Sequence, residues 1–108
     1  MIEIEHGHDG RVLCRPSCSL DFPSSLTLRH VIADILRPGL KIVIDLRHVR
    51  AVDSVGVSAL IGTGRRVRSV GGTAYIINAN PRLRCLLRSV GAEQLLAEAS
   101  VTSSPDAA

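Results

Sequence analysis

The sequence has almost no aromatic residues, no tryptophan and no long hydrophobic run. Phe22 and Tyr75 are its only aromatic residues, although hydrophobic residues make up 45% of the 108-residue chain. The core must therefore be aliphatic, and the length fits one domain. No stretch reaches the roughly 18 to 20 apolar residues of a membrane-spanning helix, and the N-terminus lacks the pattern of a signal peptide. We therefore expect a cytoplasmic protein without membrane insertion.

Cysteine is also scarce. Cys14, Cys18 and Cys85 are odd in number and sparse, so they fit reduced thiols or small core residues better than a disulfide framework. Cys14 and Cys18 provide only two ligands without a matching histidine pair downstream, and His6 and His8 lack a third ligand. We therefore expect no metal and no cofactor. A redox role of the three thiols is left as a weaker alternative.

Acidic residues are absent from residues 54–92, which carry six arginines. Residues 1–53 contain seven acidic and seven basic residues, so their charges balance. The net charge of +3 therefore comes from a positive second half, which suits an acidic protein, a phosphate group or a nucleic acid, or is simply a solvated helix face. The lack of stacking aromatics and of a binding motif disfavours nucleic acid.

The central part of the chain has the pattern of a βαβ unit. Residues 41–46 form an almost continuous β-branched run, interrupted by Asp45, which is typical of a strand covered on both faces. A helix follows from Ser54, with apolar residues at i, i+3, i+4, i+7 and i+10 from Val57 onward. A second buried strand is predicted over 74–78. The helix leaves three arginines toward water: Arg65, Arg66 and Arg68.

Two glycines inside this helix, Gly62 and Gly64, are unusual because each costs about 1 kcal/mol relative to alanine. We expect that they allow close approach of the helix to the sheet or to a partner.

The flanking segments complete a small α/β fold. Residues 1–5 and 11–15 alternate apolar and polar side chains and predict an antiparallel edge hairpin, and residues 17–21 read as a polar loop. Helices are predicted over 22–36, capped by Asp21, and over 81–90, capped by Asn80. A short last helix is expected over 92–99, with a frayed tail at 100–108.

We therefore predict a single α/β domain over residues 1–99. Its mixed, mostly parallel β-sheet of about four strands has an antiparallel N-terminal edge hairpin and packs with three to four α-helices.

Ser54 lies where the chain leaves a strand and enters a helix. In open α/β sheets this edge binds ligands, and free N–H groups at the helix N-terminus favour an anion. A plain capping role for Asp53 or Ser54 explains the same residues. Ser54 lacks the G-x-S-x-G pattern, and all four histidines lie at or before residue 48, so no catalytic set can be assembled. These features favour a binding module over an enzyme.

Five motifs follow each other along the chain: IVIDL, VDSVGV, an arginine-rich helix, GG-x-AYIINANP and LLRSVGAEQLL. Together with Leu20-Asp21 before the first helix, the run from Ile42 to Leu96 resembles a STAS domain, the fold of bacterial anti-sigma factor antagonists. Two positions differ from the family pattern. Val55 replaces a frequent hydroxyl residue, and Cys18-Ser19 replaces a glycine before the leucine-aspartate pair.

The resemblance implies partner switching with Ser54 as the phosphoacceptor. The unphosphorylated antagonist would bind an anti-sigma factor that is also a GHKL-type serine kinase and so free a sigma factor, until phosphorylation of Ser54 ends the complex. By analogy, Gly56 lets a partner backbone approach closely. The residues implied around the phosphosite are Asp21, Asp53, Val55, Gly56 and Ser58.

Such an antagonist is expected to be a monomer that binds no nucleic acid directly. Two other functions remain open. One is a non-phosphorylated STAS accessory subunit of a lipid-transport ATPase. The other, weaker one is a sensor of a nucleotide or small molecule.

Overall fold

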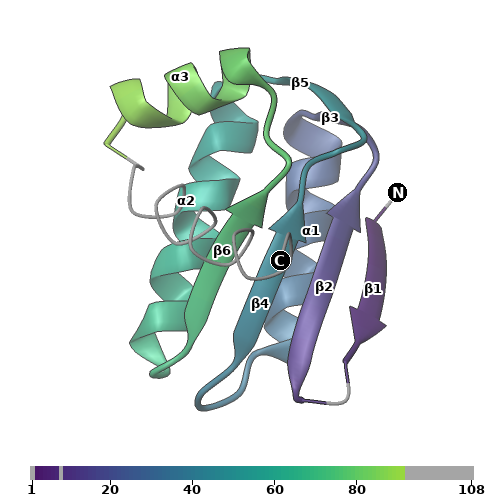
Figure 1. The fold of residues 1–108 in the computed structure, drawn as a ribbon, viewed down its shortest axis with the longest axis vertical. Helices are drawn as coiled ribbons and strands as arrows, with labels where there is room; N and C mark the ends of the chain where they lie inside the picture. Colours follow the sequence, from purple (N-terminus) through teal and green to yellow (C-terminus); the bar gives the residue numbers. More distant parts are fainter. Residues whose placement is uncertain (1, 8, 92–108) are drawn as a thin grey trace, which may run out of the picture.

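Four strands form the main sheet of the computed structural model, which describes residues 2–7 and 9–91 (Figure 1). The order across the sheet is β1-β2-β4-β6, in which β1 and β2 are antiparallel and the other two pairs are parallel. The mixed, mostly parallel sheet with an antiparallel edge hairpin is thereby confirmed. The strands are β1 (Ile2–His6), β2 (Arg11–Pro16), β4 (Lys41–Asp45) and β6 (Thr73–Ile77).

Two long helices, α1 (Phe22–Ile35) and α2 (Ser54–Ser69), lie side by side behind the sheet in Figure 1. The third helix, α3 (Pro81–Ser89), lies beyond the C-terminal ends of the parallel strands. Within the described part of the chain, no helix is long and apolar enough to cross a membrane. The helix expected over 92–99 and the tail at 100–108 lie outside the described residues.

The core between the sheet and these helices is aliphatic, as the composition predicts. Phe22 is 60% exposed and Tyr75 is only partly buried, so neither aromatic ring fills the centre. Burial raises the pKa of the Cys14 thiol to about 12, which keeps it protonated and makes it a small core residue. The fully enclosed side chains include Leu28, Ile32, Ile42, Ile44, Leu60, Val67 and Ile76.

A second sheet, which sequence analysis missed, has two short parallel strands, β3 (Cys18–Leu20) and β5 (Val49–Val52). The prediction of a loop over 17–21 was therefore wrong. No strand was predicted between residue 46 and Ser54, where β5 lies. The two strands have three and four residues, too few to show an alternating pattern. Leu20 and Val49 anchor them in the core.

Asp45 links the C-terminal ends of the three parallel strands of the main sheet. Its buried carboxylate accepts hydrogen bonds from the Asn78 side chain and the Arg47 backbone, both at 3.0 Å. It also pairs with the Arg15 guanidinium at 3.4 Å. Burial alone would raise the pKa of Asp45, but these bonds and the charge of Arg47 outweigh it and hold the pKa below its ordinary value. Asn78 itself has a φ of 59°.

Candidate functional site

The small sheet brings the beginnings of α1 and α2 together. Leu20 of β3 and Val52 of β5 are partners in the parallel register, so the next residues, Asp21 and Asp53, emerge at neighbouring strand ends. The Asp53 backbone N–H donates a hydrogen bond to the Leu20 carbonyl at 3.2 Å. Each aspartate is the N-cap of the helix that follows it. The structure therefore brings Asp21, Asp53 and Ser54 to one place.

Ser54 is the first residue of α2 and is exposed to solvent. The cap of this helix is Asp53, whose carboxylate accepts a hydrogen bond from the Gly56 N–H at 2.8 Å. The Ser54 hydroxyl makes no hydrogen bond to any residue that the structure describes. Because the capping role belongs to Asp53, this hydroxyl is available for modification or for a partner. Ser58, one turn further along, is also exposed.

Gly56 has a packing role within the protein that the family analogy does not include. It is buried, and a Cβ atom there would collide with the Leu20 carbonyl oxygen and with the Val52 side chain at 2.7 Å. The absence of a side chain therefore lets β3 of the same chain approach the first turn of α2. This close approach is made within the protein, and the approach of a partner backbone at Gly56 stays a prediction.

Three exposed apolar side chains lie in the first two turns of α1 and the first turn of α2, and sequence analysis missed most of them. Phe22 is 60% exposed, Leu26 one turn later is 41% exposed, and Val55 on α2 is 39% exposed. Large apolar side chains in water beside capping carboxylates are typical of a protein interface. A local signal was present, because Phe22 directly follows the capping aspartate and precedes the apolar stripe of its helix.

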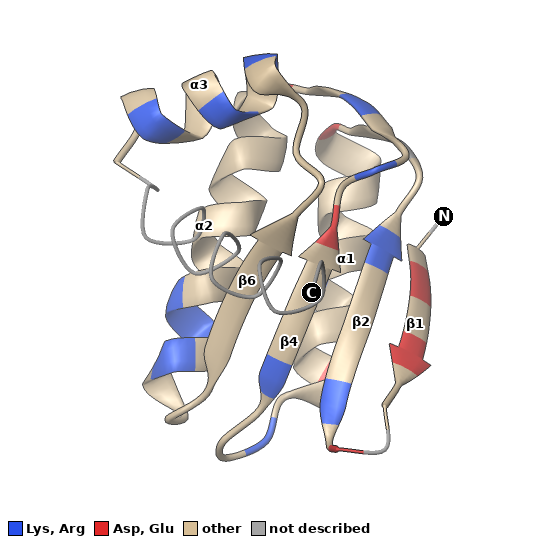
Figure 2. Ribbon diagram, in the orientation of Figure 1, with Lys and Arg blue, Asp and Glu red and all other residues tan. Residues whose placement is uncertain are grey.

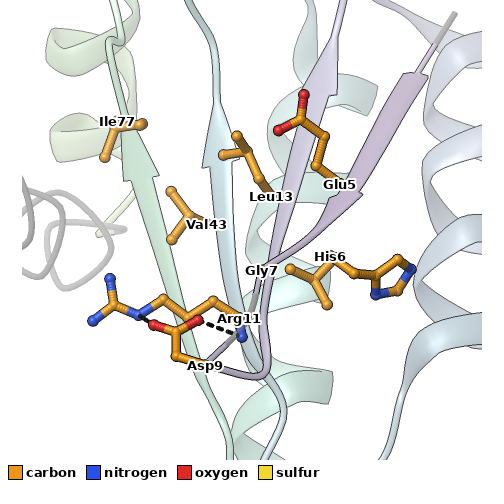
Figure 3. A pocket seen from close by; sticks show the side chains of 9 residues that line it. Glu5, His6, Gly7, Asp9, Arg11, Leu13, Val43 and Ile77 are labelled. Carbon is orange, nitrogen blue, oxygen red and sulfur yellow. Dashed lines mark hydrogen bonds and ion pairs between the residues drawn. The ribbon is translucent and has the colours of Figure 1, made fainter.

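The hollow shown in Figure 3 has a volume of about 330 Å³ and lies elsewhere. Leu13, Val43 and Ile77 belong to its lining, which also includes the turn between β1 and β2. There the Asp9 carboxylate accepts a hydrogen bond from the Arg11 N–H, which lowers its pKa, and pairs with the Arg11 guanidinium at 3.1 Å. In Figure 1 this turn lies at the opposite end of β2 from the start of α2. Among the described residues, no group of three potential metal ligands is present.

Comparison with known proteins agrees with this fold. The family model described as STAS domain matches residues 2–107. The phosphorylated form of SpoIIAA, described as a Bacillus cell fate determinant, is 20% identical with a TM-score of 0.71, covering 88% of this chain and 87% of that one. SpoIIAA in its unphosphorylated form, described as an anti-sigma factor antagonist, is 20% identical with a TM-score of 0.68, covering 82% of both chains.

A transport protein has the same fold. A sulfate transporter family protein from Wolinella succinogenes is 20% identical with a TM-score of 0.71, covering 81% of this chain and 72% of that one. A comparison with curated proteins finds no match. At these identities, the solved structures show the shared fold alone.

Proposed function

This chain belongs to the STAS domain family, and from this premise we propose that it is an anti-sigma factor antagonist controlled by phosphorylation of Ser54. In this proposal, the unphosphorylated protein binds an anti-sigma factor that is also a GHKL-type serine kinase and thereby releases a sigma factor. The observation that carries the proposal is the exposed Ser54 hydroxyl, which has no hydrogen-bond partner among the described residues.

A phosphate on Ser54 would change the interface and leave the fold intact. It adds about −1.5 to −2 charges, which the free N–H groups and the dipole of a helix N-terminus tolerate. The carboxylates of Asp53 and Asp21 stand at the adjacent strand ends and would repel the phosphate. Gly56 lies tightly against Leu20 beneath this turn, so we expect the added group to be accommodated on the outer surface.

The exposed apolar side chains of Phe22, Leu26 and Val55 provide contact area for a protein partner. An interface with an aromatic anchor and nearby charges loses affinity strongly when one more charge is buried in it. We therefore infer that partner release follows from adding charge at the centre of an apolar contact. SpoIIAA, whose structures in both phosphorylation states share this fold, supports the proposal by analogy.

The proposal is tested by a pull-down from cell lysate with the wild-type chain and three variants, Ser54→Ala, Ser54→Asp and Ser89→Asp. Ser89 is exposed on α3, so its variant adds the same charge away from the site. We expect a GHKL-type kinase on every bait except Ser54→Asp, with phosphate mapped to Ser54 of the wild-type chain. Equal recovery of a transport ATPase by all four baits would overturn the proposal in favour of a constitutive accessory subunit.

A further inference from the structure

We propose that the groove between α1 and α2 is a docking site for an acidic segment of a protein partner. The groove has a volume of about 400 Å³. Its lining combines Arg29 of α1 with Gly62, Arg65 and Arg66 of α2. The site is separate from Ser54, and only the identity of its natural partner rests on the proposed function.

No carboxylate of the described residues forms an ion pair with the arginines of the groove. Among residues 2–7 and 9–91, none that lines the groove is acidic, and Arg29, Arg65 and Arg66 pair with no carboxylate there. Arg11 and Arg15, by contrast, both pair with carboxylates of the chain. Figure 2 shows the basic residues gathered at the C-terminal end of α2. Three cations around one concave surface create a positive potential that favours an acidic partner.

Gly62 provides an independent observation. Sequence analysis expected it to allow close packing against the sheet or a partner. Outside the backbone of α2 itself, however, no atom of the described residues lies within 4 Å of the position that its Cβ would occupy. Packing against the sheet is therefore excluded for Gly62. Glycine in a helix interior lowers helix stability, and here no contact within the described protein requires it. We infer that the open space above Gly62 admits the partner chain into the groove.

The groove continues the surface on which Ser54 lies. Ser54, Ser58, Gly62 and Arg65 follow at intervals of four, four and three residues, so they form one stripe along α2. Over these residues the helix rises by about 16 Å, the length of a three-turn helix or of a shorter extended peptide. A partner seated over Ser54 therefore reaches the groove. Nucleic acid is a poorer occupant, because none of the described residues that line the groove is aromatic and available for base stacking.

The charge requirement is tested by titrating the ¹⁵N-labelled full chain with an octaglutamate peptide. We expect the affected backbone signals to map to the groove. Arg29→Glu and Arg65→Glu should each weaken binding about tenfold, and added salt should weaken binding to the wild-type chain. Arg84→Glu is the matched control, since it makes the same charge change at an exposed position of α3, outside the groove. Equal weakening by all three variants would overturn the proposal, as would tighter binding of a 12-base-pair DNA duplex than of the peptide.

The role of the open space above Gly62 is tested with Gly62→Gln. This substitution leaves the net charge unchanged and introduces a better helix former. We expect the variant to unfold at the same temperature as the wild-type chain or a higher one, yet to bind octaglutamate several-fold more weakly. Unchanged binding would overturn the role of Gly62. The peptide measurement needs no kinase, so a failure of the Ser54 switch and a failure of the groove are separately visible.

Discussion

The two long helices begin in the same way but present different groups to solvent. Each follows a short parallel strand, and each is capped by an aspartate. In α1 the third residue is Ser24, whose hydroxyl donates to the Ser19 carbonyl at 2.8 Å and accepts from the Asp21 N–H at 2.9 Å. In α2 the third residue is Gly56, and the serine is instead the first residue, Ser54.

The difference shows how one local construction serves two purposes. In the first turn of α1, Ser24 belongs to a capping box, in which its hydroxyl stabilises the start of the helix. The first turn of α2 obtains tight packing from Gly56 against Leu20 and leaves its serine facing water. In the first turn of α2, Gly56 thus provides the packing and Ser54 the exposed hydroxyl. This separation allows Ser54 to be modified without loss of the fold.

Gly56→Ala should disturb this arrangement most. The added methyl group would collide with the Leu20 carbonyl, and we expect the free energy of unfolding to fall by about 2–3 kcal/mol. Urea denaturation followed by circular dichroism measures the change. Gly62→Ala in the same helix is the control and should be neutral or stabilising, because nothing lies near its Cβ position. Similar midpoints for the two variants would show that the contact of Gly56 with β3 is unimportant.

Asp45→Asn tests the contribution of a buried carboxylate, in contrast to the exposed capping carboxylates of Asp21 and Asp53. The pKa of Asp45 is lowered in the folded state, so its stabilising effect is complete above the ordinary pKa of about 3.9 and is lost as pH falls through the folded value. We expect Asp45→Asn to lower the free energy of unfolding at pH 7 by about 1–3 kcal/mol.

The variant should also unfold with a smaller pH dependence than the wild-type chain below about pH 4. Chemical denaturation at several pH values from neutral to acidic gives both quantities. A parallel pH dependence in the two proteins would assign the acid sensitivity to other carboxylates.

Phe22→Ala addresses the surface beside the two helix starts. Because the ring is 60% exposed, we expect its removal to change the free energy of unfolding by no more than about 0.5 kcal/mol. Binding of the kinase recovered with the wild-type chain should weaken about tenfold, as for an aromatic anchor in an interface. Val90→Ala, at a residue 48% exposed beyond α3, provides the control for isothermal titration calorimetry. Equal affinity of the wild-type and Phe22→Ala chains would place the interface elsewhere.

Ser24→Ala and Ser54→Ala test the smallest difference between the two helix starts. Loss of the Ser24 hydroxyl removes its hydrogen bonds with the backbone of Ser19 and Asp21 and should cost about 0.5–1 kcal/mol. Loss of the Ser54 hydroxyl should cost less than about 0.5 kcal/mol, since no hydrogen bond to a described residue depends on it. Thermal unfolding of the pair measures the contrast, and a reversed order would contradict the roles assigned here.

Much of this architecture was predictable because its signals are local. A capping aspartate or asparagine with proline one or two residues later identified the starts of α1 and α3, and a nearly continuous β-branched run identified β4. The pairing of β3 with β5 was not predictable, because it joins short segments about thirty residues apart whose burial depends on the assembled core. Element type was therefore easier to predict than the partner of each element.

In the candidate site, too, the features with a local sequence signal were predictable and those that depend on long-range contacts were not. Ser54 and Asp53 were found from a sequence motif at a strand-to-helix junction, and the structure places them with Asp21. The contact of Gly56 with Leu20 could not be inferred, since Leu20 lies 36 residues earlier in the chain and reaches Gly56 only through the small sheet. The exposure of Phe22 likewise depends on how α1 is rotated on the sheet.

The order of the strands in the main sheet also bears on how fast the protein folds. Apart from the hairpin of β1 and β2, each strand pairs with one about 30 residues away, as Cys14 does with Ile44 and Ile44 with Ile76. Closing such loops loses chain entropy before the contacts compensate, so folding in milliseconds or slower is expected, later than the formation of its isolated helices. A newly made chain can complete the main sheet only after β6 has left the ribosome.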